Sequence, residues 1–353
     1  MNDEKQMILE MLKEGKITVE EANSLLDAIG SKRSRNENDF VSRLNQSIDS
    51  VIKKTTETFE SLSSFDFDNI ELNQYSIKGQ VNTHKEMRID DEINTINIDI
   101  PSGKIFIDRA TDSAITVSQD IWAKKGDLID YIDIEISDDV LDIRLNESYQ
   151  NFDATSILKL ELGKNLYDNL NIHLVNGVVE IEDVDFNSSD IDTVNARITV
   201  INSEGNIDVN NVNGKVDIKN TNGYLNLENV NGSVYLSNIC GEGANIKATS
   251  GNVRVDGLNS KTLKAENSSG NIRIFNIKDV EDIKVNSGSG NIVIDATEYS
   301  DNIKAHVISK DLDFADKYKN KVEKEAGFEI STSIDDAKLN IEAKAPFGKV
   351  SLR

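Results

Sequence analysis

A repeated glycine pattern between residues 205 and 236 constrains the fold of this sequence more than any other feature. Glycine returns every nine residues at Gly205, Gly214, Gly223 and Gly232, and each is followed by two apolar residues separated by one other residue. Alternation of this kind is typical of a short β-strand, because successive side chains point to opposite faces. Asn and Gly tolerate positive φ and turn the chain between strands. The segment therefore predicts one strand of three to five residues per nine or ten residues.

The same unit continues at wider spacing, with glycines at Gly251, Gly270 and Gly290. Strand-like runs still occupy the positions between them. A fixed period predicts a repeat architecture, in which each strand adds a rung and the stacked rungs bury a continuous core. We predict a mainly-β chain with a β-solenoid-like domain. An up-and-down antiparallel arrangement is the alternative, since Asn-Gly is also the strongest type I′ hairpin signal. The expected core pairs are Ile105 with Ile107, Ile207 with Val209, Val216 with Ile218, Leu225 with Leu227, Val234 with Leu236, Val253 with Val255, Ile272 with Ile274, and Ile292 with Ile294.

The ends of the repeat region are expected to be irregular, because an open solenoid exposes unpaired strand edges. Residues 311–328 are rich in Lys, Asp and Glu. They predict a surface insertion or a short helix before a last strand pair near residues 329–352.

The first thirty residues have the pattern of a helical hairpin. Gly15 and Gly30 are placed as helix ends, and Thr18 with Glu21 forms a capping box for the second helix. A hairpin of this size is too small to bury a stable core alone, so its apolar face must meet another surface. We predict that the docking residues here are Ile8, Leu12, Leu25 and Leu26.

Residues 38–64 have the periodicity of an amphipathic helix. Its apolar stripe supplies the remaining candidate docking residues, which are Phe40, Leu44, Ile48, Val51 and Phe59. Packing on the hairpin or self-association as a coiled coil is the first interpretation. A membrane-surface helix is the second, although such helices usually carry a Lys/Arg-rich polar face and this segment is nearly neutral. A flexible spacer is the third.

These patterns divide the chain into a helical hairpin (1–30), an amphipathic helix with linker (31–70) and a β domain (71–353). The motif GKITVEEANSLL in the hairpin resembles the SHOCT-like helical module. The repeated glycine-strand unit resembles the bacterial "putative adhesin", or toastrack, β-domain family. The resemblance implies a binding or scaffolding protein linked to bacterial cell-envelope stress. It implies no catalytic residues.

Charge and composition restrict the classes of partner. The sequence has 39 Lys and Arg against 62 Asp and Glu, a formal net charge of −23, which disfavours a general nucleic-acid binder. The single cysteine, Cys240, excludes an internal disulfide and fits a reducing compartment. The N-terminus lacks the pattern of a secretory signal, and no apolar run is long enough to span a bilayer. We expect a cytoplasmic protein, with peripheral contact at the inner membrane face as the alternative.

The sequence offers no strong signal for catalysis, a cofactor or a metal. His84, His173 and His306 lie far apart and lack zinc-site spacing, so they are interpreted as ordinary strand or turn residues. Cys240 is interpreted as a small buried core or corner residue and not as a reactive thiol. Calcium on the Asn- and Asp-rich turns is a weaker alternative. The Ser-Gly-Asn motifs precede strands rather than helices, so they are interpreted as turns and not as phosphate loops. The acidic clusters are interpreted as solvated outer faces of strands, namely Asp90, Asp91, Glu92, Asp138, Asp139, Glu180, Glu182, Asp183 and Asp185.

The resulting functional hypothesis is a non-enzymatic scaffold or regulatory interaction protein that docks on a protein partner, or on itself, through its N-terminal helices. Two alternatives stay open: a structural protein that polymerises end to end, and a carbohydrate-binding, adhesin-like domain.

Overall fold

The computed structural model describes residues 81–353 except 124–129, 147, 150–153, 298, 300–301, 325–326 and 334–335. The predicted helical hairpin, the amphipathic helix and all nine candidate docking residues lie outside the described residues. In the described part the chain forms strands without helices, so the mainly-β prediction is confirmed. The strands are β1 (Val81–Ile89), β2 (Thr95–Arg109), β3 (Ile115–Ala123), β4 (Ile132–Ser137), β5 (Val140–Leu145), β6 (Ala154–Leu162), β7 (Tyr167–Glu182), β8 (Phe186–Ile201), β9 (Asn206–Asn213), β10 (Val216–Asn231), β11 (Val234–Ser250), β12 (Val253–Ser269), β13 (Ile272–Ile277), β14 (Asp282–Ser289), β15 (Ile292–Ile294), β16 (Ile303–Phe314), β17 (Asn320–Lys324), β18 (Gly327–Ser331) and β19 (Leu339–Leu352).

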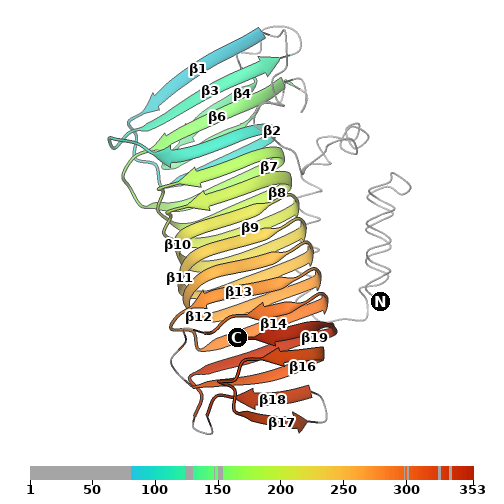
Figure 1. The fold of residues 1–353 in the computed structure, drawn as a ribbon. Coiled ribbons are helices and arrows are strands. Elements are labelled where there is room, and N and C mark those ends of the chain that lie inside the picture. Colours follow the sequence, from blue (N-terminus) through green and yellow to red (C-terminus); the bar gives the residue numbers. More distant parts are fainter. Residues whose placement is uncertain are drawn as a thin grey trace, which may run out of the picture. The chain divides into compact units, whose positions relative to one another are not determined.

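The central strands, β7 to β15, stack in parallel (Figure 1). One column of the ladder runs from Ile198 through Val216, Val234 and Val253 to Ile272. Side chains bonded between neighbouring coils are 18 to 20 positions apart in sequence. Stacked rungs pair in this way, whereas hairpins pair antiparallel. One coil therefore contains two of the nine-residue units seen in the sequence.

The strands are longer than the three to five residues expected. β10 has 16 residues, and β11 and β12 have 17 each, because the chain keeps its strand pairing through one corner of the coil. The alternating burial predicted for the apolar pairs is present: each member of the eight pairs has at most 3% of its surface exposed. Side chains at the corners add to this core, since Val230 and Ile239 are also buried.

Each coil has two corners of different construction. At the glycine corner, φ is +128° for Gly214, +136° for Gly232 and +118° for Gly251. At the left-handed corner, a non-glycine residue takes a φ of +52° or +53°, as in Asn202, Asn220 and Asn238. Asparagine tolerates this region better than other non-glycine residues because its short side chain bonds locally. The two corners alternate along the chain.

Polar ladders hold successive corners together. At the glycine corner, buried and half-buried amides bond from coil to coil, with Asn195 donating to Asn176 at 2.8 Å and Asn213 donating to Asn195 at 2.8 Å. A second ladder lies inside the same corner, where Asn211 and Asn229 are each 1% exposed and bond at 3.1 Å. Buried amides of this kind need partners, and the neighbouring coil supplies them.

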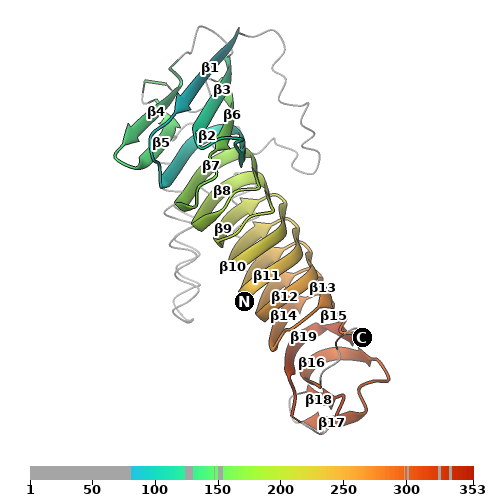
Figure 2. The same cartoon turned by 90° about the vertical axis from the view of Figure 1, so that its left-hand side faces the viewer.

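The N-terminal end is closed by an excursion of the chain. β2 pairs with β7, with cross-coil partners 74 positions apart, and β3 to β6 lie between them in sequence. β5 and β6 pair in parallel with the other edge of β2. β3 and β4 then pair antiparallel with β6 and β5, and β1 pairs antiparallel with β3 (Figure 2). The rungs are thus irregular here, as expected.

The C-terminal end has a comparable arrangement. The last strand, β19, pairs on one edge with β14 and β15 and on the other with β16. β18 pairs antiparallel with β16, and β17 with β18. The short helix allowed for within residues 311–328 is therefore wrong: this segment contains the end of β16, a turn, β17 and the start of β18. An antiparallel hairpin satisfies the edge of the last parallel rung, which a helix would leave unpaired.

Candidate binding surface

The turn glycines singled out in the sequence occupy coil corners. Gly205, Gly214, Gly223, Gly232, Gly251 and Gly270 have φ between +118° and +150°. A Cβ at Gly290 would lie 2.1 Å from the carbonyl oxygen of Gly270. These residues shape the coil and present no side chain to a ligand.

The histidines and the cysteine do not come together. Nδ1 of His84 lies 2.9 Å from Asp120 on the outer strands, whereas Nε2 of His173 lies 3.5 Å from Asp192 in the central stack. Cys240 stands just before the corner glycine Gly241, so of the two positions expected for it, core or corner, the structure gives the corner, where it is half-buried and not fully buried. Within the described residues, no group of three His, Cys, Asp or Glu side chains is arranged to hold a metal ion.

A polar hollow lies beside the left-handed corners of β7 and β8, with a volume of about 490 Å³. Its lining includes Arg109 at the end of β2, Lys164 and Leu166 from the β6–β7 loop, and Asp185 and Glu204 from the following corners. The rest of the lining consists of Phe186, Gly205 and four asparagines, which are Asn165, Asn187, Asn206 and Asn222. Sequence reasoning identified Asp185 only as a solvated acid and Gly205 only as a turn residue, and missed the others, because they come from five separate segments.

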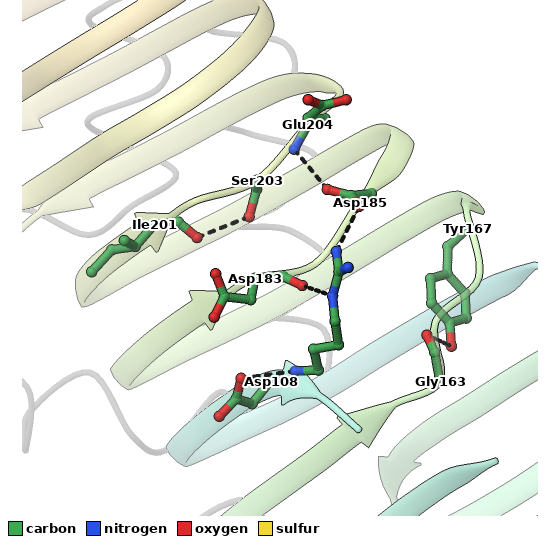
Figure 3. Close-up of polar contacts among 9 residues, drawn as sticks. Asp108, Gly163, Tyr167, Asp183, Asp185, Ile201, Ser203 and Glu204 are labelled. Atoms are coloured by element: carbon green, nitrogen blue, oxygen red, sulfur yellow. Dashed lines mark hydrogen bonds and ion pairs between the residues drawn. The ribbon is translucent and has the colours of Figure 1, made fainter. Parts of the chain in front are cut away.

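Arg109 is fixed at this hollow by the chain of the next coil. Its Nε donates to the Asp183 carbonyl at 2.5 Å, and a terminal nitrogen lies 2.6 Å from Oδ2 of Asp185. Oδ1 of the same carboxylate accepts a bond from the Glu204 backbone N–H at 3.2 Å (Figure 3). Asp183, whose carbonyl accepts this bond, has a φ of +56°, so its left-handed conformation points the carbonyl outward. Asp185 therefore links three consecutive coils at this point.

Buried Tyr167 forms part of the framework behind the hollow. Its hydroxyl donates to the Gly163 carbonyl at 3.3 Å (Figure 3), and burial raises its pKa to about 12. The phenol is therefore neutral at physiological pH and acts as a donor that anchors the β6–β7 loop. The exposed Lys164 and Leu166 side chains on that loop are left facing the hollow or solvent. Amides, two cations and two carboxylates suit a polar, hydroxyl-rich small molecule better than an apolar one.

His173 provides a titration prediction. The hydrogen bond to Asp192 is the main cause that raises the pKa of His173 above 6.5, with added attraction from Asp99 and Asp190. A raised folded-state pKa stabilises the chain below the unfolded pKa, and this contribution disappears as pH rises through the folded value. In an Asp192→Asn variant we expect the NMR-measured pKa of His173 to fall toward 6.5. Asp256→Asn, on another face, is the matched control, and equal shifts in both variants would contradict the pairing.

The described residues contain no helix that is long and apolar enough to cross a membrane.

Among curated proteins, none matches this sequence significantly. Several solved structures are similar to this chain, and three of them are given with their identities and coverages. One, described as a "putative adhesin" from Parabacteroides distasonis ATCC 8503, is 13% identical, with 78% of this chain and 98% of that chain covered and a TM-score of 0.38.

A "putative adhesin" from Parabacteroides merdae ATCC 43184 is 12% identical, with 78% of this chain and 97% of that chain covered and a TM-score of 0.37. A "putative lipid binding protein" from Parabacteroides distasonis ATCC 8503 is 14% identical, with 77% of this chain and 96% of that chain covered and a TM-score of 0.36. At the other end of the chain, residues 3–34 match the family model of the SHOCT-like domain, so the resemblance of this segment is confirmed.

Proposed function

We propose that this chain is a non-enzymatic interaction protein, in which the coiled β region is a rigid body and the N-terminal segment is a docking arm. The observation that supports this proposal most is the continuous parallel stack closed at both ends by antiparallel strands. Such a body holds its shape without a partner and offers its sides and its N-terminal segment for binding. The bacterial cell-envelope setting implied by the family resemblance belongs to the same proposal, as does a cytoplasmic location, with peripheral contact at the inner membrane face as the alternative.

The test uses the full chain and a variant in which Leu44 and Ile48 are replaced by glutamate. We expect the wild type to oligomerise, or to retain a protein partner in a pull-down. We expect the variant to lose that association, because burying a charged side chain in an apolar interface costs a large free energy. Light scattering coupled to size-exclusion chromatography measures the oligomer. Lys54→Glu, outside the predicted stripe, is the control. Association that survives in the double variant would refute the docking arm, and flotation of only the wild type with liposomes would assign the arm to a membrane.

End-to-end polymerisation is the less favoured alternative. The outermost strand at the C-terminal end, β17, has only five residues and carries Lys321, Glu323 and Lys324. Short, charged edge strands resist pairing with another chain. The net charge of −23 adds repulsion between copies.

Carbohydrate binding is the second candidate function, and the hollow around Arg109 is the observation that favours it. The lining amides and charges can donate to and accept from hydroxyl groups. The test is ¹H–¹⁵N NMR of the full chain during titration with a panel of oligosaccharides. Shifts confined to residues of the hollow, and lost in Asn187→Ala but kept in Asn291→Ala, would support it. No shift with any sugar in the panel would count against it.

A further inference from the structure

One face of the central coils is positively charged, although the chain as a whole is strongly acidic. We define the basic face by the outward residues in the part of each coil that runs from the glycine corner to the left-handed corner, from β8 to β13. In the ladder, Asp217 lies beside Tyr235, Tyr235 beside Arg254, and Arg254 beside Arg273. The cations of the basic face are Arg197, Lys215, Lys219, Arg254 and Arg273, and its aromatic side chains are Tyr235 and Phe275.

Only two carboxylates share this face with the five cations. Oδ2 of Asp217 lies 3.0 Å from both Lys215 and Lys219, and the residue is 91% buried between them. Asp256 is paired with Arg254 at 2.6 Å. Arg273 is exposed and forms no ion pair within the described part of the chain. The face therefore keeps unneutralised positive charge.

Aromatic rings hold two of the cations in place. Nζ of Lys215 lies 4.6 Å from the ring centre of Tyr235, and the Arg254 guanidinium lies 4.8 Å from that of Phe275. Cation–π contacts of this type order long side chains before a ligand arrives. Lys215 and Arg254 nevertheless keep 46% and 43% of their side-chain surface exposed, so their charges stay accessible.

We propose that the basic face binds an acidic peptide segment of a partner protein. Guanidinium and ammonium groups donate strong, charge-assisted hydrogen bonds to carboxylates. Tyr235, 36% exposed in the middle of the cations, offers an apolar surface for the side chains between those carboxylates. This surface lies wholly within the β region and does not depend on the proposed docking arm.

The charge distribution favours a compact anionic partner over a membrane or a nucleic acid. Glu180 and Glu182 on β7 border the basic face at one end, and Asp295 after β15 borders it at the other. Charges act over about 8 Å at physiological ionic strength. A peptide confined between these borders meets mainly the cations. An extended anionic surface also meets the acidic flanks of a chain with a net charge of −23.

The experiment measures fluorescence anisotropy of a labelled oligoglutamate peptide with the full-length protein. The test variant is Arg254→Gln with Arg273→Gln. The control is Lys264→Gln with Lys284→Gln, which removes the same charge from neighbouring coils on a different face, where each lysine is paired with a glutamate. We expect wild type and control to bind alike and the test variant to bind at least about tenfold more weakly, as the loss of charged hydrogen bonds implies. Matching thermal unfolding curves establish that all three proteins are folded.

Three results would overturn the proposal. The wild type fails to bind the peptide at low salt, or the control loses as much affinity as the test variant. In the third, the wild type does not bind the peptide but binds vesicles containing anionic lipid, and the Arg254→Gln with Arg273→Gln variant loses this vesicle binding. That result would assign the basic face to a membrane surface.

Discussion

Removing residues 214–231 is expected to leave a folded, cooperative β domain, whereas removing only residues 214–222 is expected to destabilise it more. Both deletions join Asn213 to a glycine and preserve the repeated sequence pattern. The longer deletion removes one whole coil, since cross-coil partners are 18 positions apart there. The shorter one removes half a coil.

The difference arises because the two corners are not interchangeable. After the longer deletion, Gly232 takes the place of Gly214 at the glycine corner, and Asn238 takes the place of Asn220 at the left-handed corner. After the shorter deletion, Gly223 stands at a glycine corner, and every later residue is offset by half a coil. The chain can restore the register only by looping out residues 223–231. Closing such a loop costs about 2 kcal/mol in addition to the coil that is lost.

Urea denaturation and hydrogen exchange measure the two outcomes. We expect a lower midpoint for the shorter deletion than for the longer one, and rapid exchange of residues 223–231 only in the shorter. An order of stability that follows the number of deleted residues would contradict a two-corner coil. It would instead make the nine-residue unit the structural repeat.

The buried pairs were the most predictable part of the fold. Ile207 and Val209, like Leu225 and Leu227, alternate with polar residues over several consecutive units, and alternation of that kind reports burial on one side of a strand. The true coil length was harder to predict. The tetrapeptides at 211–214, 220–223 and 229–232 share the pattern Asn-x-Asn-Gly, yet Asn211 is buried while Asn220 has φ of +52°.

A signal for two kinds of corner is nevertheless present. Beyond Gly241, regularly spaced glycines persist at the glycine corner, as Gly251, Gly270 and Gly290, while Asn276 serves a left-handed corner without a following glycine. The pairing of the terminal strands has no comparable signal. β2 and β19 meet strands distant in sequence, and local periodicity carries no information about such partners. The hollow and the basic face were missed for the same reason, because each combines residues from several coils.

Replacing Gly232 by valine is expected to lower the free energy of unfolding by about 3–5 kcal/mol, combining backbone strain with steric overlap. The residue has φ of +136°, which a β-branched side chain rarely adopts. A Cβ there would lie 2.0 Å from the carbonyl oxygen of Gly214 and 2.7 Å from its carbonyl carbon. Those atoms belong to the backbone of the neighbouring coil, so they cannot move aside as a flexible side chain would.

Ser233→Val is the matched control, because this half-buried neighbour lies outside the positive-φ residues. We expect it to change the free energy of unfolding by less than about 1 kcal/mol. Asn220→Gly tests the left-handed corner, where φ of +52° suits glycine as well as asparagine. We expect only the loss of its two 2.9 Å side-chain bonds, one donated to Asn202 and one accepted from Asn238. Gly232→Asn should remain strongly destabilising, since asparagine tolerates the left-handed helical region but not φ of +136°. If asparagine were tolerated equally at positions 220 and 232, the two corners would not differ in construction. The structural repeat would then be the nine-residue unit and not the coil of two such units.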